Sequence, residues 1–280
     1  MNLHVIQTGY FKLDGGAMFG VVPKSIWQRT NPADDNNLCS WAMRCLLVED
    51  GNRLVLIDTG VGDKQSEKFF SYYYLHGEES LMSSLKNAGF GPEEVTDVIL
   101  THLHFDHCGG AVKRVGEEKY APAFPNARYW SNTDHWNWAE NPNPRERASF
   151  LQENFKPLES NDQLKFLNPG QESPFNNISV LYMDGHTEKQ MLPKIQYKGR
   201  TLVFAADLIP SVGHIPLAYV MGYDVRPLVT MKEKDEFLKE AARNNYILYF
   251  EHDPVNECCT VKETERGIRV HETFPLKDLI

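Results

Sequence analysis

The sequence has few cysteines and no long apolar run, and both absences limit what the chain can be. Its 280 residues include only 5 cysteines, an odd number without a C-x-x-C pair, which argues against a disulfide framework. No stretch approaches the roughly 18 apolar residues that a membrane helix needs. The first residues also lack the charged and apolar regions of a signal peptide. We therefore expect a cytoplasmic protein that does not insert into a membrane.

Basic residues are also scarce relative to acidic ones. The chain has 29 Lys and Arg against 38 Asp and Glu, a formal net charge of -9, and no basic run. Because proteins bind nucleic acid by neutralising phosphates with Lys and Arg, we expect no nucleic-acid partner. The 41% of hydrophobic residues is ordinary for a globular protein. A chain of this length can bury a large core, and we expect a single domain over residues 1–280.

Short apolar runs alternate with helical segments, which predicts an α/β fold. Two hairpins are expected, one over 46–57 with its turn at 50–52 and one that turns at 198–199. Further strands are predicted at 98–100, 178–182, 201–205 and 246–250. Helices are predicted at 79–88, from 92, at 131–139 with a Ser131/Asp134 capping box, at 146–155, and at 230–242 with a Thr230/Glu233 box.

Five residues that can bind metal come just after the ends of these strands: Asp58, His102, His186, Asp207 and His252. Ligand sites of α/β folds collect at the carboxyl ends of strands, where the loops meet. The repeated placement of such residues therefore predicts a common site.

A second pattern is local. His102, His104, Asp106 and His107 lie within six residues, at H-x-H-x-D-H spacing. In a tight loop, alternate residues can face one metal ion while the next pair faces a neighbouring ion. Imidazole and carboxylate suit zinc, and also iron, manganese or cobalt. The motif therefore predicts a metal site.

The run Thr101–Gly110 resembles the signature of the metallo-β-lactamase superfamily, and the later Asp-Gly-His, Ala-Asp and Glu-His pairs follow in that family's order. The resemblance implies an αβ/βα four-layer sandwich and two divalent metal ions, with zinc preferred. It implies one metal ion held by His102, His104 and His186, a second held by Asp106, His107 and His252, and Asp207 as a bridge. Asp58 would orient a ligand histidine.

Two further segments narrow the resemblance. Leu13–Gly20 and the stretch between Asp207 and Thr230 resemble N-acyl-homoserine lactonases, in particular the Chryseobacterium type, and methyl parathion hydrolase. The resemblance implies a quorum-quenching hydrolase that opens the lactone ring by attack of a metal-bridging hydroxide, with Asp207 holding the nucleophile. A phosphotriesterase or aryl esterase is the alternative. A non-catalytic scaffold is disfavoured, because buried acids and histidines without metal are costly. The partner is a small ester or lactone, and a homodimer stays open.

One departure concerns the group that contacts the substrate. The Bacillus-type lactonases carry a tyrosine three residues after the bridging aspartate, where this chain has Pro210. We expect His214 or Tyr223 to take over this catalytic role, with preference for His214 because it lies in a turn-rich loop. The rings of 69–74 and 136–138 either line an acyl-chain channel or pack in the core.

Overall fold

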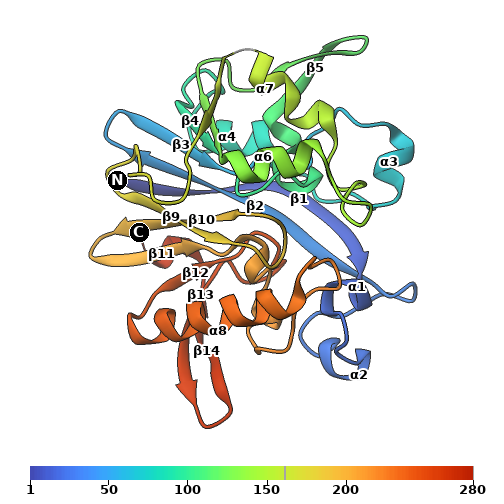
Figure 1. Ribbon diagram of the computed structural model, residues 1–280, viewed down its shortest axis with the longest axis vertical. Coiled ribbons are helices and arrows are strands. Elements are labelled where there is room, and N and C mark those ends of the chain that lie inside the picture. The colour runs from blue at the N-terminus through green and yellow to red at the C-terminus, as the bar shows by residue number, and fades with distance from the viewer. Residues whose placement is uncertain (161, 280) are drawn as a thin grey trace. The chain divides into compact units, whose positions relative to one another are not determined.

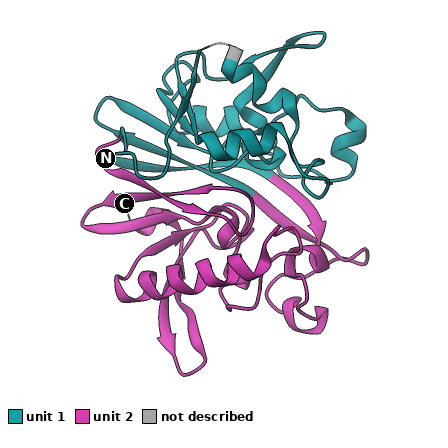
Figure 2. Cartoon of the chain, viewed as in Figure 1, with its two compact units in different colours: residues 1–9, 43–174 teal, residues 10–42, 175–280 magenta. Residues whose placement is uncertain are grey.

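The computed structural model describes residues 1–160 and 162–279, which form two compact units (Figure 2). Unit 1 comprises residues 1–9 and 43–174, and unit 2 comprises residues 10–42 and 175–280. The long strands β1 (Asn2–Asp14) and β2 (Leu38–Asp50) contribute residues to both units. The expectation of a single domain over the whole chain stays a prediction.

The first sheet contains six strands in the order β1-β2-β3-β4-β7-β8. Its strands β1 to β4 are labelled in Figure 1. Beyond β1 and β2, its strands are β3 (Arg53–Ile57), β4 (Asp97–Ile99), β7 (Arg128–Ser131) and β8 (Leu164–Phe166). The predicted hairpin is confirmed, since β2 and β3 pair antiparallel from Leu46–Ile57 to Asp50–Arg53. The strands β3, β4, β7 and β8 run parallel to one another, so their carboxyl ends lie at one edge.

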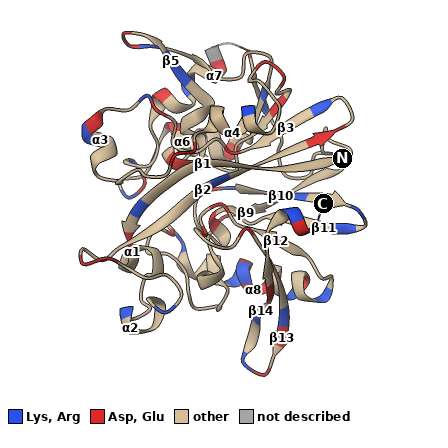
Figure 3. Ribbon diagram, turned by 180° about the vertical axis from the view of Figure 1, so that it is seen from behind, with Lys and Arg blue, Asp and Glu red and all other residues tan. Residues whose placement is uncertain are grey.

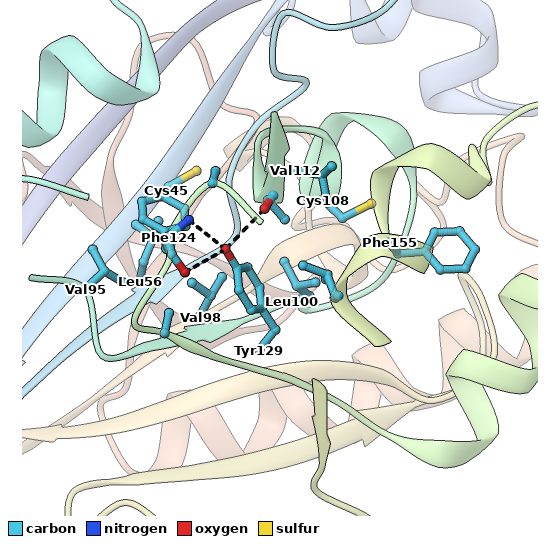
Figure 4. Packing of buried hydrophobic residues seen from close by; sticks show 14 of the residues in the cluster. Cys45, Leu56, Val95, Val98, Leu100, Cys108, Val112, Phe124, Tyr129 and Phe155 are labelled. Carbon is cyan, nitrogen blue, oxygen red and sulfur yellow. Dashed lines mark hydrogen bonds between the residues drawn. The ribbon is translucent and has the colours of Figure 1, made fainter. Parts of the chain in front are cut away.

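Helices of unit 1 cover this sheet through one apolar cluster, part of which is drawn in Figure 4. The cluster joins Leu85 and Trp136 to the strand residues Leu56 and Val98. The elements of unit 1 outside the sheet are α3 (Glu67–Ser71), α4 (Leu81–Asn87), α5 (Phe105–Cys108), η1 (Gly109–Ala111), β5 (Val112–Gly116), β6 (Lys119–Pro122), α6 (Thr133–Glu140), η2 (Gln152–Asn154) and α7 (Lys156–Ser160).

One polar group lies inside this cluster. The hydroxyl of Tyr129 accepts a hydrogen bond from the Phe124 amide at 2.9 Å and donates to the Ala111 carbonyl at 3.2 Å (Figure 4). Burial raises the pKa of this phenol. The two backbone partners satisfy a hydroxyl that would otherwise be costly to bury.

Unit 2 holds the second six-stranded sheet, in the order β14-β13-β12-β11-β10-β9. Its strands are β9 (Ile178–Met183), β10 (Gln190–Tyr197), β11 (Arg200–Phe204), β12 (Ile247–Tyr249), β13 (Cys258–Thr264) and β14 (Gly267–Phe274). The remaining elements are α1 (Gly15–Phe19), α2 (Lys24–Trp27), η3 (Ala206–Leu208), η4 (Val212–His214), α8 (Pro227–Arg243) and η5 (Leu276–Leu279). Phe237 and Ala241 of α8 pack with Val203 and Leu248 of the sheet. The predicted α/β class, its strands and its second hairpin are confirmed.

The helix boundaries differ from the prediction in several places. The segment that begins at Pro92 is a turn, and 146–155 holds only the short η2. The cap of α6 is Asn132, which accepts from the His135 amide, in place of Ser131. Helix α8 begins one turn before Thr230, because Pro227 occupies its first turn, where proline is favoured.

The surface of the fold carries both signs of charge. Figure 3 shows Lys and Arg interspersed with Asp and Glu in this view, and both kinds occur on β13 and β14. Among the described residues, no helix combines the length and the apolarity that a membrane span requires.

A lysine lies at the centre of unit 2. Lys234 of α8 is fully buried, and its ammonium donates to the carbonyls of His214, Pro216 and Tyr219 at 2.9, 3.0 and 2.8 Å. Its three protons therefore satisfy three carbonyls of a loop that has no regular ladder of its own. This contact ties the loop after β11 to the long helix.

We expect Lys234→Met to lower the free energy of unfolding by about 2–4 kcal/mol, because it leaves three loop carbonyls without a donor. Urea unfolding followed by circular dichroism measures the change. Lys232→Met makes the same substitution at an exposed site of the same helix and should change stability by less than about 0.5 kcal/mol. Equal effects of the two substitutions would contradict the anchoring role.

Candidate metal centre

The predicted ligands follow the strands at a regular distance. His102, His186, Asp207 and His252 each come three residues after the last residue of β4, β9, β11 and β12. In unit 1, β3 and β4 are parallel, and in unit 2, β11 and β12 are parallel. Parallel neighbours release their loops at the same edge, so each unit gathers its own ligands there.

The H-x-H-x-D-H motif forms a compact cluster in unit 1. His102, His104, Asp106 and His107 are all buried, and the ring of His102 lies 4.5 Å from that of His104 and 3.9 Å from that of His107. The loop turns into the short helix α5, for which His104 is the N-terminal flanking residue. Gly109 then packs so closely that a Cβ would collide with the Val61 carbonyl. Only glycine allows the motif to lie this close to the chain that follows β3.

Asp58 holds this loop in place, as predicted. One carboxylate oxygen accepts from the Thr101 amide at 2.7 Å. The other lies 2.6 Å from the Thr101 hydroxyl and 3.1 Å from Nδ1 of His107. Since the hydroxyl proton goes to Asp58, the Thr101 oxygen can only accept from Nδ1 of His102, 3.1 Å away. Asp58 therefore orients His107 directly and His102 through Thr101.

Another histidine that was not predicted also supports the motif. His135 of α6 is fully buried, and its Nε2 accepts from the amide of Leu103 at 2.8 Å. That amide lies between His102 and His104, so His135 fixes the backbone from which these two side chains extend. Its position 32 residues away in the sequence left no local signal.

Unit 2 contributes the second cluster, which is centred on Asp207. One oxygen of Asp207 lies 3.1 Å from Nε2 of His186, and the other lies 3.1 Å from Nε2 of His252. The Asp207 amide donates to the side-chain carbonyl of Gln190 at 3.1 Å. All three members of the cluster are buried. A single carboxylate is thus placed between two imidazoles, one on each oxygen.

The far nitrogens of both imidazoles are held by acceptors. Nδ1 of His186 lies 2.9 Å from Asp224, and Nδ1 of His252 lies 2.8 Å from the Ala42 carbonyl. A carbonyl can only accept, so His252 carries its proton on Nδ1, and Asp224 favours the same tautomer in His186. Both rings then direct the Nε2 lone pair toward Asp207. Asp224 was not predicted for this role.

The donor set therefore fits a metal ion. Buried imidazoles that are oriented through one ring nitrogen, alongside buried carboxylates, are the ligands that zinc and similar cations take. The described residues of the chain include His/Asp clusters suited to binding metal. Cys108 is a buried thiol that donates to the Leu103 carbonyl at 3.3 Å, and burial raises its pKa to about 12. It is therefore a packed residue of the core.

The surroundings of His214 differ from the prediction that a turn-rich loop presents it to the substrate. It is buried, its Nδ1 lies 2.8 Å from the Ser211 hydroxyl, and its Nε2 lies 2.9 Å from the Met18 carbonyl. Its ring stacks on Phe19 at 4.3 Å. Both nitrogens are used within unit 2, where His214 joins the N-terminal helix to the loop after Asp207. Tyr223, by contrast, is 40% exposed.

The aromatic run before α4 reaches the motif. Phe69 and Tyr73 pack on Phe105, with ring centroids 5.3 and 4.6 Å apart. Phe105 lies between His104 and Asp106 in the sequence, and the charge of Asp106 adds to burial in raising the pKa of Tyr73 to about 12. Tyr72 and Tyr74 are exposed. Part of this run therefore forms apolar surroundings for the motif.

Comparison with known proteins agrees with these features. A sequence profile of the metallo-β-lactamase superfamily matches residues 44–252. An N-acyl homoserine lactonase of Bacillus cereus is 32% identical over 84 residues, which are 26% of this chain and 34% of that protein. The chain thus aligns with about a third of the length of this curated relative.

Solved structures match over nearly the whole chain. A probable metal-dependent hydrolase from Staphylococcus aureus is 26% identical, covers 98% of this chain and 96% of its own, and superposes with a TM-score of 0.88. A dizinc quorum-quenching lactonase in complex with a product is 21% identical, with coverages of 98% and 95% and a TM-score of 0.79. These matches confirm the predicted metallo-β-lactamase fold.

The buried His214 generates a prediction about acid stability. Burial lowers the pKa of His214 to about 3, from the ordinary value of 6.5. Between these two pKa values the folded state binds fewer protons than the unfolded state. The stability that the neutral His214 contributes is therefore fully present above pH 6.5 and is lost as the pH falls below that value. From about pH 7.5 to about pH 5, the expected loss from this group is about 2 kcal/mol.

Urea unfolding of metal-free protein at both pH values, compared with His214→Gln, measures this loss. Glutamine keeps a donor and an acceptor but does not titrate, so the variant should lose about 2 kcal/mol less than the parent on acidification. The other histidines are common to both proteins, and their effect cancels in the comparison. The same acid sensitivity in parent and variant would contradict a neutral, buried His214.

Proposed function

The chain belongs to the metallo-β-lactamase superfamily, and from that membership we propose that it opens the lactone ring of N-acyl homoserine lactones at a dinuclear metal site. The superfamily makes the chain a hydrolase. The lactone substrate is the finer proposal, supported by the Bacillus lactonases and by the dizinc lactonase with the same fold. A cytoplasmic location and a homodimer stay predictions.

The position of Asp207 carries the proposal. Its two oxygens each face the Nε2 of a different histidine at 3.1 Å, and both of those imidazoles are held by their opposite nitrogens. A carboxylate in that setting suits a bridge, because its charge screens the repulsion between two dications. From the ligand order of the superfamily, we propose that one metal ion takes His102, His104 and His186 and that the other takes Asp106, His107 and His252.

Two divalent ions, with zinc as our choice, would supply Lewis acidity and lower the pKa of water to near neutrality. Residues of the chain would transfer the proton, orient the ligand imidazoles and exclude water. In this proposal, Asp207 accepts a proton from the attacking water and passes it to the leaving alkoxide oxygen. Asp58 and Asp224 keep the imidazoles in the required tautomer, and Phe105 with Tyr73 excludes water from one side of the motif.

The group that contacts the lactone is proposed to be Tyr223. It is 40% exposed and directly precedes Asp224, the partner of His186, so its backbone is fixed beside a ligand. His214 is committed to Ser211 and Met18 and has a structural role instead. Phosphotriester or aryl ester hydrolysis is the second candidate. Pro210 favours it, since the tyrosine that the Bacillus-type lactonases carry there is missing.

We expect two metal ions per chain by elemental analysis of the purified protein. His104→Ala and His252→Ala should each lower the metal content toward one ion and lower kcat/KM by more than about 100-fold, since each removes one ligand. Asp207→Ala should weaken the binding of both metal ions. His271→Ala, at an exposed histidine, is the control and should change nothing. Two tightly held ions in Asp207→Ala would show that this carboxylate is not the bridge.

Substrate class is tested with a panel of acyl homoserine lactones, an unsubstituted lactone, a phosphotriester and an aryl ester. Each methylene that enters an apolar channel contributes about 0.8 kcal/mol, so a few added methylenes should lower KM by roughly tenfold. We expect long-chain acyl lactones to have the highest kcat/KM of the panel. Efficient hydrolysis of the phosphotriester, with every acyl lactone ignored, would establish the second candidate.

A further inference from the structure

A carboxylate outside the motif lies beside one of its histidines. Glu146 follows α6 in a turn of unit 1 and is only 3% exposed. Its Oε1 lies 3.4 Å from Nε2 of His104, within ion-pair distance. The same segment also contacts the motif through Phe150, whose ring lies 4.7 Å from His104, and through Ser149, which accepts from the Phe105 amide at 2.9 Å.

The other oxygen of Glu146 is fixed by two donors. The indole Nε1 of Trp138 donates to Oε2 at 2.8 Å, and the side-chain amide of Asn143 donates to the same oxygen. Asn143 in turn accepts from the backbone amide of Glu146 at 3.2 Å. Trp138 and Asn143 thus determine which oxygen of Glu146 faces His104.

This contact involves the opposite ring nitrogen from the supporting contacts of the other proposed ligand histidines. His102, His107, His186 and His252 each engage a protein acceptor through Nδ1, which leaves Nε2 for a metal ion. At His104 it is Nε2 that faces a carboxylate from outside the proposed ligand set, that of Glu146. A proton held on Nε2 places the lone pair of His104 on Nδ1.

We propose that Glu146 is the positioning residue of His104. It accepts the Nε2 proton and thereby presents Nδ1 of that imidazole to the metal ion. The inference rests on the proposed metal site. It also gives Trp138, one of the rings noted in the sequence, a role together with Asn143, since both donate to Glu146. Carboxylates that hold a ligand histidine in this way typically contribute 10- to 100-fold to metal affinity.

The two donors on Oε2 make Glu146→Gln an informative change. The new amide must direct its oxygen toward Trp138 and Asn143, so its NH2 group faces Nε2 of His104. Two donors then oppose each other, which favours the tautomer of His104 with its proton on Nδ1. That tautomer cannot bind a metal ion through Nδ1. The charge and the acceptor are lost with almost no change in volume.

The experiment measures metal affinity directly. Zinc is titrated into metal-free protein in competition with a chromophoric chelator, and the visible spectrum of the cobalt-loaded protein reports on the ligands. Glu146→Gln should weaken one of the two sites by roughly 10- to 100-fold and alter the cobalt spectrum. Trp138→Phe removes one donor from Oε2 and should weaken the same site by a smaller factor. Glu117→Gln makes the same change at an exposed position of unit 1 and should behave as the parent.

Thermal unfolding of the metal-free proteins separates positioning from folding. If Glu146→Gln unfolds earlier but binds zinc like the parent, Glu146 has only a structural role and the inference is wrong. If Glu146→Gln proves too unstable, Trp138→Phe decides, and parental zinc affinity in that variant counts against the inference. If the unsubstituted protein binds fewer than two zinc ions, the proposed dinuclear site is wrong, independently of the result for Glu146→Gln.

Discussion

Buried imidazoles and carboxylates are costly unless each has a partner, and this constraint organises the candidate metal centre. Asp58 accepts from Thr101 and lies beside His107, Asp224 lies beside His186, and Glu146 is near His104. Each pair fixes an imidazole and compensates part of the cost of burying it. These pairs also fix the loops that carry the proposed ligands, although those loops have little regular secondary structure.

The sheets supply the second requirement, which is position. Four of the proposed ligands come three residues after the end of a strand. Strands β4, β11 and β12 each have a parallel neighbour, and β9 pairs antiparallel with β10. Backbone hydrogen bonds fix each strand, so a residue shortly beyond its end has little freedom. The remaining freedom is removed by supports from distant segments, such as His135 under Leu103 and Lys234 under the loop that contains His214.

These two features together suit a hydrolase of the metallo-β-lactamase superfamily. An acceptor behind each imidazole sets which ring nitrogen is available, and each oxygen of Asp207 lies 3.1 Å from Nε2 of His186 or of His252. We propose that substrate preference lies in the surrounding apolar residues, of which Phe69, Tyr73 and Phe105 form one contiguous group.

The α/β class, most strands and the candidate ligands could be predicted from the sequence, because they depend on short-range patterns. Apolar runs, hairpin turns and H-x-H-x-D-H spacing are visible within about ten residues. The predicted helices at 92 and 146–155 were wrong. In the second segment, Glu146 lies in a turn and accepts hydrogen bonds from Trp138 and Asn143, which local helix propensity does not predict. The supports of the ligands, His135, Asp224 and Glu146, lie 32 to 42 residues from the groups they hold, and the burial of His214 depends on Met18 and Phe19. Hydrogen-bond pairing over such separations leaves no periodicity in the chain, so only the tertiary structure decided which polar residues support the candidate metal centre.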